Sequence, residues 1–261
     1  MNEGSVIRKK VSFALRLIDD YDLQPVSSGV DIIINKELYR SIKKSGGYYI
    51  FTNLEEDDCE INIESEIYFK EKIEIDVSSL DPLNPLINIR LKKKPEYFSA
   101  QGATIVRFKL IDEGNKPIVG ALVEAFIDTK NYYEGELSEA CKKSEELVSI
   151  KKFYSEIQPG DTFYLNAGSG DNGEFVKVVN KKDDTKFVLN KPLLFDHSKG
   201  GKLIKAFISK TDEKGNGLIY FRGLLKKDID IKINLSYFKS FKEVSTKVRE
   251  GTLLNLKNIT L

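Results

Sequence analysis

The sequence matches itself over two distant stretches, and this internal repeat limits the possible folds more than any other feature. The matched segments are Gly47–Leu54 with Gly217–Leu224, Cys59–Ser65 with Ile229–Leu235, and, after a one-residue gap, Tyr68-Phe69 with Tyr237-Phe238. The starts of the two units also match, pairing Phe13, Leu15, Leu17, Ile18 and Asp19 with Val106, Phe108, Leu110, Ile111 and Asp112. Because two repeats are too few for a solenoid, the match favours duplication of a whole domain.

The repeated segments alternate apolar and polar residues, which is typical of strands buried on one face. Cys59, Ile61 and Ile63 alternate with acidic or amide residues, and Ile229–Leu235 shows the same period. Turn residues such as Ser45-Gly46-Gly47 separate these short stretches, as expected for an all-β chain of sandwiches. One core should hold Phe13, Leu15, Leu17, Ile61 and Ile63, and the other Val106, Phe108, Leu110, Ile231 and Ile233.

We therefore predict two transthyretin-like or immunoglobulin-like β-sandwiches. Residues 1–95 would form the first, with 86–91 as its closing strand and a basic linker after it. The second would comprise 101–128 and 203–261, interrupted by a β-rich module at 129–202. A segment of that length inside a domain must fold or be disordered.

The inserted module contains three strand-like stretches, 161–165, 174–179 and 186–189, with a glycine-rich loop at 166–173. The preceding stretch, 137–157, is ambiguous. Leu147, Ile150, Tyr154 and Ile157 fit one face of a helix, whereas part of the stretch also fits a strand. We favour a small β module with one short helix leading into it.

The composition argues against several partner classes. Lys and Arg number 41 against 40 Asp and Glu, so the basic excess typical of nucleic-acid binders is missing. No apolar run approaches the length of a membrane span, and the first residues do not resemble a secretory signal, so we expect neither nucleic acid nor membrane as a partner. Two widely spaced cysteines predict reduced thiols, with Cys59 on a buried strand face. The expected location is the cytoplasm, either free or within a particle released by lysis.

No arrangement of residues predicts catalysis or a cofactor. His197 is the only histidine, and its neighbours Asp196 and Ser198 are too close in sequence to form a triad with it, so we expect a surface or turn histidine. A histidine-based metal site lacks ligands. The loop around Gly168–Gly173 has oxygen ligands for a weak calcium site, which remains an alternative to a plain loop. The predicted class is a non-enzyme.

Residues 110–123 and 211–217 resemble the carboxypeptidase regulatory-like domain, a transthyretin-like β-sandwich related to the B-type repeats of collagen adhesins. The first stretch carries that family's strand, turn, proline and Gly-Ala opening, and the second its Thr-Asp-Gly turn. Repeats of the adhesin type form an isopeptide bond from a strand lysine, but Leu17 and Leu110 stand at those positions, so this crosslink is not expected. Cytoplasmic proteins with such an insertion resemble accessory components of phage-tail-like contractile injection systems.

The leading functional hypothesis is a structural or adaptor protein that binds protein partners in a larger assembly, such as a contractile phage-tail-like particle. The alternative is a carbohydrate-binding or adhesin module, suggested by paired aromatics that fit either core packing or a sugar platform. We expect the insertion to carry the partner-binding surface, because loops on a rigid scaffold usually do. Its predicted contact residues are Tyr132, Tyr133, Asp171 and Asn172.

Overall fold

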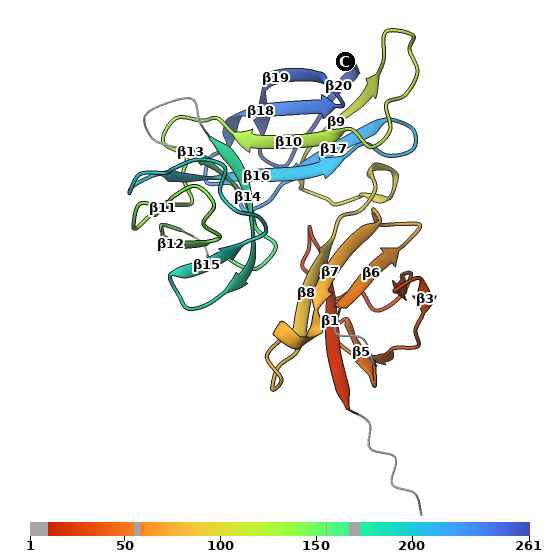
Figure 1. The fold of residues 1–261 in the computed structure, drawn as a ribbon. Helices are drawn as coiled ribbons and strands as arrows, with labels where there is room; N and C mark the ends of the chain where they lie inside the picture. The colour runs from red at the N-terminus through yellow and green to blue at the C-terminus, as the bar shows by residue number, and fades with distance from the viewer. Residues whose placement is uncertain (1–9, 55–57, 155, 167–172) are drawn as a thin grey trace, which may run out of the picture. The chain divides into compact units, whose positions relative to one another are not determined.

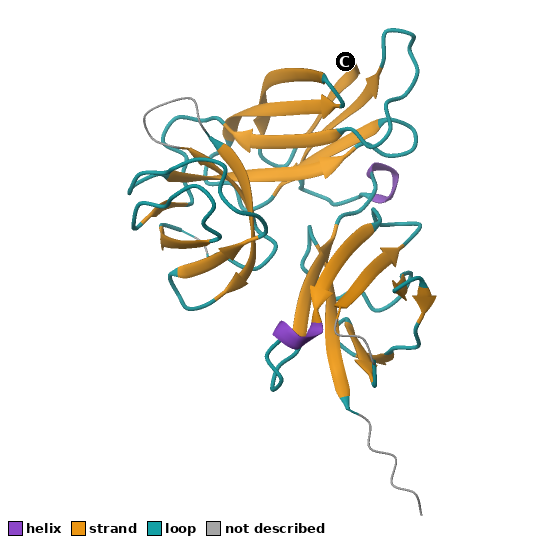
Figure 2. Cartoon of the chain, viewed as in Figure 1, coloured by secondary structure: helices purple, strands orange, loops and turns teal. Residues whose placement is uncertain are grey.

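The computed structural model describes residues 10–54, 58–154, 156–166 and 173–261. These residues divide into two compact units, Met1–Tyr97 and Phe98–Leu261. Figure 2 shows strands and loops throughout, and the described helices are two short 3-10 turns at Val77–Ser79 and Pro95–Tyr97. The all-β prediction is therefore confirmed. Within the described chain, no helix is long and apolar enough to span a bilayer.

The first unit contains two four-stranded sheets (Figure 1). One has the order β4 (Ile42–Lys44), β5 (Tyr48–Thr52), β1 (Val11–Asp19), β8 (Leu86–Leu91). The other has the order β3 (Glu37–Leu38), β2 (Asp31–Ile34), β6 (Asp58–Glu64), β7 (Glu71–Asp76). Strand β1 pairs antiparallel with β5 and parallel with β8.

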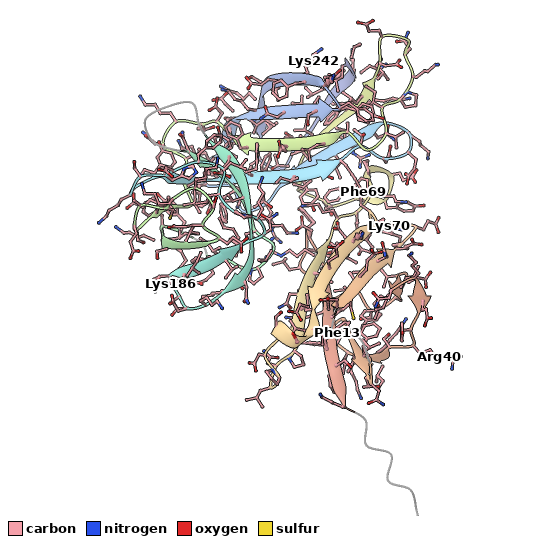
Figure 3. All side chains as sticks on the ribbon, viewed as in Figure 1. Phe13, Arg40, Phe69, Lys70, Lys186 and Lys242 are labelled. Carbon is pink, nitrogen blue, oxygen red and sulfur yellow. The ribbon has the colours of Figure 1, made fainter. Side chains whose placement is uncertain are left out.

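Both sheets of the first unit contribute to one hydrophobic core. In β1 every second residue is buried, and Phe13, labelled in Figure 3, packs at 5.1 Å against the ring of Phe51 from β5. In β6 the buried residues are Cys59, Ile61 and Ile63, as the alternation predicted. Period-2 alternation therefore identified the inward face of both strands.

The second unit also has its first strand paired on both sides, here within a three-stranded sheet. Its smaller sheet is β17 (Asn216–Phe221), β9 (Thr104–Ile111), β20 (Leu253–Thr260), with β9 antiparallel to β17 and parallel to β20. Its larger sheet includes β16 (Lys202–Lys210), β10 (Leu122–Ile127), β18 (Asp228–Tyr237) and β19 (Ser240–Arg249), in that order. The predicted core residues of this unit, Val106, Phe108, Leu110, Ile231 and Ile233, are all buried.

The alignment of the repeats needs one correction. We aligned Gly47 with Gly217, but the structure makes Gly47 equivalent to Gly215. Leu17 N donates to Gly47 O at 2.9 Å, and Leu110 N donates to Gly215 O at 2.8 Å. The error is two residues, and a shift of two keeps every side chain on the same face of a strand. The core residues were therefore identified correctly although the alignment was wrong.

Gly47 and Gly215 lie where a turn passes close to the backbone of the first strand of each unit. Both have positive φ, 76° and 75°. A Cβ on Gly47 would lie 2.4 Å from Leu17 O, and one on Gly215 would lie 2.7 Å from Leu110 O. Each glycine therefore lets a turn pass directly against the first strand of its unit.

Replacing Gly47 with alanine should destabilise the first unit by about 2–4 kcal/mol, because it adds a backbone clash to the cost of positive φ. The matched control is Gly29→Ala, which has φ 72° but whose nearest contact would be Ile67 Cδ1 at 3.9 Å. That control should cost about 1 kcal/mol. Denaturant unfolding of both variants measures the difference, and equal losses would contradict the close-approach argument.

The insertion forms a closed six-stranded barrel. Its strands are β11 (Gly135–Leu137), β12 (Leu147–Lys152), β15 (Lys186–Leu189), β14 (Glu174–Lys181), β13 (Thr162–Asn166) and the first part of β16. Pairing of β11 with β16 closes the circle. The three predicted strands are confirmed. The short helix was wrong, because 147–152 alternates in burial as a strand and packs Val148 and Ile150 into the barrel core.

Strand β16 belongs to both the barrel and the larger sheet. Residues 202–205 pair with β13, whereas 206–210 pair with β10. Ring contacts reinforce this junction, because Phe126 of β10 stacks at 4.1 Å on Tyr164 of β13 and meets Phe175 of β14 edge-on at 5.9 Å. The barrel is therefore continuous with the sheet in hydrogen bonding and in packing, and Figure 1 shows the two side by side.

A buried carboxylate closes one end of the first unit. Asp19 Oδ1 accepts from the backbone N–H of Tyr21 and Asp22. Its Oδ2 accepts from Tyr68 Oη at 3.0 Å and from Lys93 Nζ at 2.8 Å. Burial alone would raise the pKa of Asp19, but these hydrogen bonds and the Lys93 charge hold the pKa below its ordinary value.

Asp19→Asn should therefore destabilise the first unit at neutral pH by about 1–3 kcal/mol, since Lys93 loses its partner charge while partly exposed. The pKa is lowered in the folded state, so this contribution is present above the ordinary aspartate pKa of about 3.9 and disappears as pH falls through the folded value. Urea unfolding at neutral and acidic pH measures it. The difference in free energy of unfolding between the wild type and Asp19→Asn should become smaller in acid. The control Asp31→Asn changes an exposed residue, and its free energy of unfolding should stay close to that of the wild type at either pH.

Candidate functional site

The two tyrosines predicted to contact a partner lie on opposite sides of the chain just before β11. Tyr132 is 1% exposed, and its Oη accepts from Leu225 N at 3.2 Å. Burial raises the pKa of Tyr132 to about 12. The expectation that Tyr132 is exposed was wrong, because this side chain anchors the barrel to the loop after β17. Adjacent residues in an extended segment point to opposite faces, so a Tyr-Tyr pair presents only one ring to solvent.

Tyr133 is the outward member of the pair, and a lysine lies over its ring. The Lys202 ammonium is 5.5 Å from the Tyr133 centroid and 5.6 Å from that of Phe153. The same ammonium donates to Glu136 Oε2 at 2.5 Å. This hydrogen bond and the lysine charge lower the pKa of Glu136. Lys202 therefore holds two aromatic rings and a carboxylate in one place.

Two further aromatics extend this surface, which we call the aromatic patch: Tyr133, Phe153, Tyr154, Lys202 and Glu136. Phe153 N donates to Glu134 O at 3.0 Å, which places the end of β12 beside the start of β11. Tyr154 is 70% exposed, and its ring meets Phe153 at 6.3 Å. The sequence missed Phe153 and Tyr154 as site residues because they fall in the stretch whose fold was ambiguous.

The aromatic patch combines exposed rings with a paired lysine and carboxylate. Exposed rings supply apolar contact area, and the lysine and carboxylate beside them supply directional polar contacts. Such a surface fits an anchor residue of a protein partner or the apolar face of a sugar ring. Asp171 and Asn172, the other predicted contact residues, lie outside the described residues.

A buried glutamate–histidine pair lies elsewhere in the barrel. His197 Nε2 is 2.9 Å from Glu174 Oε1, and both side chains are nearly inaccessible. The Glu174 carboxylate also accepts from the backbone N–H groups of Leu194 and Phe195. The expectation of a surface or turn histidine was therefore wrong. The local sequence does not indicate that His197 is buried, because its partner Glu174 lies 23 residues earlier, in β14.

This pair acts as a structural tie. A substrate has no access to groups this deeply buried, and the carboxylate is used in three hydrogen bonds that fix the 190–198 segment to β14. His197 also pairs through its backbone with Cys141, N to O in both directions. Cys59 and Cys141 are both buried, and neither forms a disulfide. Within the described ranges, no group of three or more His, Cys, Asp or Glu side chains is placed to hold a metal ion.

Comparisons with known proteins do not assign a family. No protein-family model matches the sequence, and no curated protein matches it. Among solved structures, the shaft pilin spaA from Lactobacillus rhamnosus GG aligns at 9% identity over 97% of both chains, with a TM-score of 0.25. The Streptococcal ancillary pilin aligns at 10% identity over 94% of this chain and 61% of its own, with a TM-score of 0.23. The Bacillus anthracis TIE protein aligns at 9% identity over 96% and 50%, also at 0.23. TM-scores this far below 0.5 do not establish a shared fold.

Glu174→Ala should destabilise the second unit by about 3–5 kcal/mol, because it leaves the two buried N–H groups and His197 without their acceptor. Glu146→Ala, an exposed glutamate in the same barrel, is the control and should change little. Unfolding followed by tyrosine fluorescence suits a chain with no tryptophan. A loss as small as that of the control would contradict the structural tie.

Proposed function

We propose that this chain is a non-catalytic structural protein that assembles with protein partners, and that its inserted barrel carries the docking surface. The supporting observation is the aromatic patch. Exposed Tyr154 and Phe153 and partly exposed Tyr133 lie around Lys202 on a barrel that already has its own closed core. These side chains contribute little to folding, so contact with another molecule is the best account of their exposure.

The domain arrangement proposed with this function is a tandem of two equivalent sandwiches. Residues 1–95 form one, 101–128 with 203–261 form the other, and 129–202 is the module added to the second. The equivalent strand orders, β3-β2-β6-β7 and β16-β10-β18-β19, support the duplication. So does the parallel pairing of the first and last strands in both units. In this arrangement the sandwiches act as a rigid support and the barrel provides recognition.

The narrower forms of the proposal differ in their partner. In a contractile phage-tail-like particle, the chain would co-purify with sheath, tube or baseplate proteins. In an adhesin-type protein, the aromatic patch would bind a glycan, and ring stacking with ion-paired polar groups beside it is the chemistry that favours this second candidate.

Replacing Phe153 and Tyr154 together with serine should weaken docking about tenfold or more, since exposed aromatic anchors supply much of the binding energy at such surfaces. Leu147→Ser is the matched control, being an exposed apolar residue of β12, the strand that ends just before Phe153. Quantitative co-purification of the native assembly tests the contractile-particle candidate, and a glycan array tests the adhesin-type candidate. Retention of every partner and every glycan by the double variant would place recognition outside the patch.

A further inference from the structure

Strand β19 is the longest open sheet edge in the described part of the chain. It ends the nine-stranded order, and among the described strands it pairs with β18 alone (Figure 1). It has ten residues, with no proline and no register shift along its pairing with β18. The next longest edge strand, β20, has eight residues and is interrupted by a register shift between Asn255 and Asn258. β19 therefore lacks the short length, bulges and prolines that commonly keep a sheet edge from pairing with another strand.

The hairpin turn determines which backbone groups of β19 face the open edge. Tyr237 pairs with Ser240 across a two-residue turn, so Ser240 and every second residue after it bond to β18. Glu250 continues this alternation beyond the strand, because its N–H donates to Lys227 O at 2.7 Å. The intervening residues direct their N–H and C=O groups away from β18, and their side chains are exposed: Phe241, Glu243, Ser245 and Lys247. This edge can therefore accept a further strand through its backbone.

The exposed side chains of β19 complement a second copy of the same strand. They lie on the outer face of the sheet, since Val248 on the alternate face is buried. Two copies of β19 can run antiparallel with their Ser245 residues opposite each other. Glu243 of each copy then lies opposite Lys247 of the other, and Phe241 lies opposite Arg249 of the other. Acid–base pairs across strands stabilise a sheet, and an arginine packs well against an aromatic ring.

Other antiparallel registers of two β19 strands lose part of this complementarity. Centring the pair on Val244 places Glu243 opposite Ser245, and centring it on Glu243 places two like charges opposite each other. Centring it on Thr246 keeps an acid–base pair but moves Phe241 beyond the end of the facing strand. The register centred on Ser245 is therefore the best matched of the four.

Charges on β18 support the same register. Lys247 Nζ lies 3.7 Å from Asp230 Oδ1 of β18. A second Glu243 opposite Lys247 would therefore place this ammonium between two carboxylates. Both members of the pair have side chains that reach solvent, so forming it requires no burial of an unpaired charge.

We propose that β19 pairs antiparallel with β19 of a second copy, around a two-fold axis at Ser245, so that the larger sheet continues across a dimer. A second copy is favoured over an unrelated strand because one edge supplies both members of each charge pair. A strand pair buries less surface than the standard interface of about 1,600 Å², so the dimer should form at micromolar rather than nanomolar concentrations. This contact is separate from the aromatic patch on the barrel.

Sedimentation velocity of the full chain between about 1 µM and 1 mM tests the dimer. The wild type should change from the mass of a monomer to that of a dimer over this range. Lys247→Glu places two carboxylates opposite each other and should weaken association about tenfold, and Glu243→Lys should do the same with two ammonium groups. The double variant with both substitutions restores the pairs with their signs exchanged, so it should associate as the wild type does.

A backbone variant and a control complete the test. Ser245→Pro removes an N–H that points away from β18, so it should weaken association while circular dichroism and denaturant unfolding stay close to the wild type. Lys72→Glu changes an exposed lysine of β7, and the dimer should form as in the wild type. A wild type that stays monomeric throughout the range would overturn the proposal. So would a dimer that persists in Lys247→Glu and Ser245→Pro, or a double variant that associates no better than the single ones.

Discussion

Both units depend on a first strand that is hydrogen bonded on its two sides. β1 lies between β5 and β8, and β9 lies between β17 and β20. Because the last strand of each unit runs parallel to the first, the chain must leave this sheet and return to it, and the second sheet is built on the way. Phe13, Leu15 and Leu17 fill the space between the sheets of the first unit. Gly47 and Gly215 allow the turn before the next strand to pass directly against this central strand.

The same topology explains why an insertion is tolerated in the second unit. The barrel enters between β10 and β16, and β16 pairs with β10 along only part of its length. The remaining residues of β16 belong to the barrel, and they close it by pairing with β11 and β13. Closure removes the unpaired edges that a half-formed insertion would expose. The entropic cost of a longer connection grows slowly with length, so a module with its own core can be accommodated.

The sequence predicted the buried faces of strands, which depend on the local period of apolar residues. It failed where contacts between residues distant in the sequence decide the structure. Alternation identified the buried faces of β1, β6 and β18 even though the repeat alignment was two residues out, because a period of two tolerates that error. It did not resolve 147–152, where a short apolar stretch fits a helix and a strand equally well. Hydrogen bonds from other elements also left no trace. The sequence predicts a turn histidine at 197, but Glu174 of β14 lies beside it in the fold. It likewise predicts an exposed Tyr132, whose hydroxyl in fact accepts a hydrogen bond from Leu225 N.

A Tyr-Phe pair occurs in both units, and the chain around each pair decides how the aromatics are used. In the first unit a longer loop connects β6 to β7. Within this loop Phe69 N donates to Lys92 O, and Tyr68 Oη donates to Asp19 Oδ2. Both aromatics are buried there, and they serve the core. In the second unit β18 continues to Tyr237 and turns within two residues, which leaves no backbone to fold Phe238 inward. The same two residue types are therefore packed in one unit and displayed in the other, and the positive φ of Phe238 is the backbone strain of the tight turn that displays it.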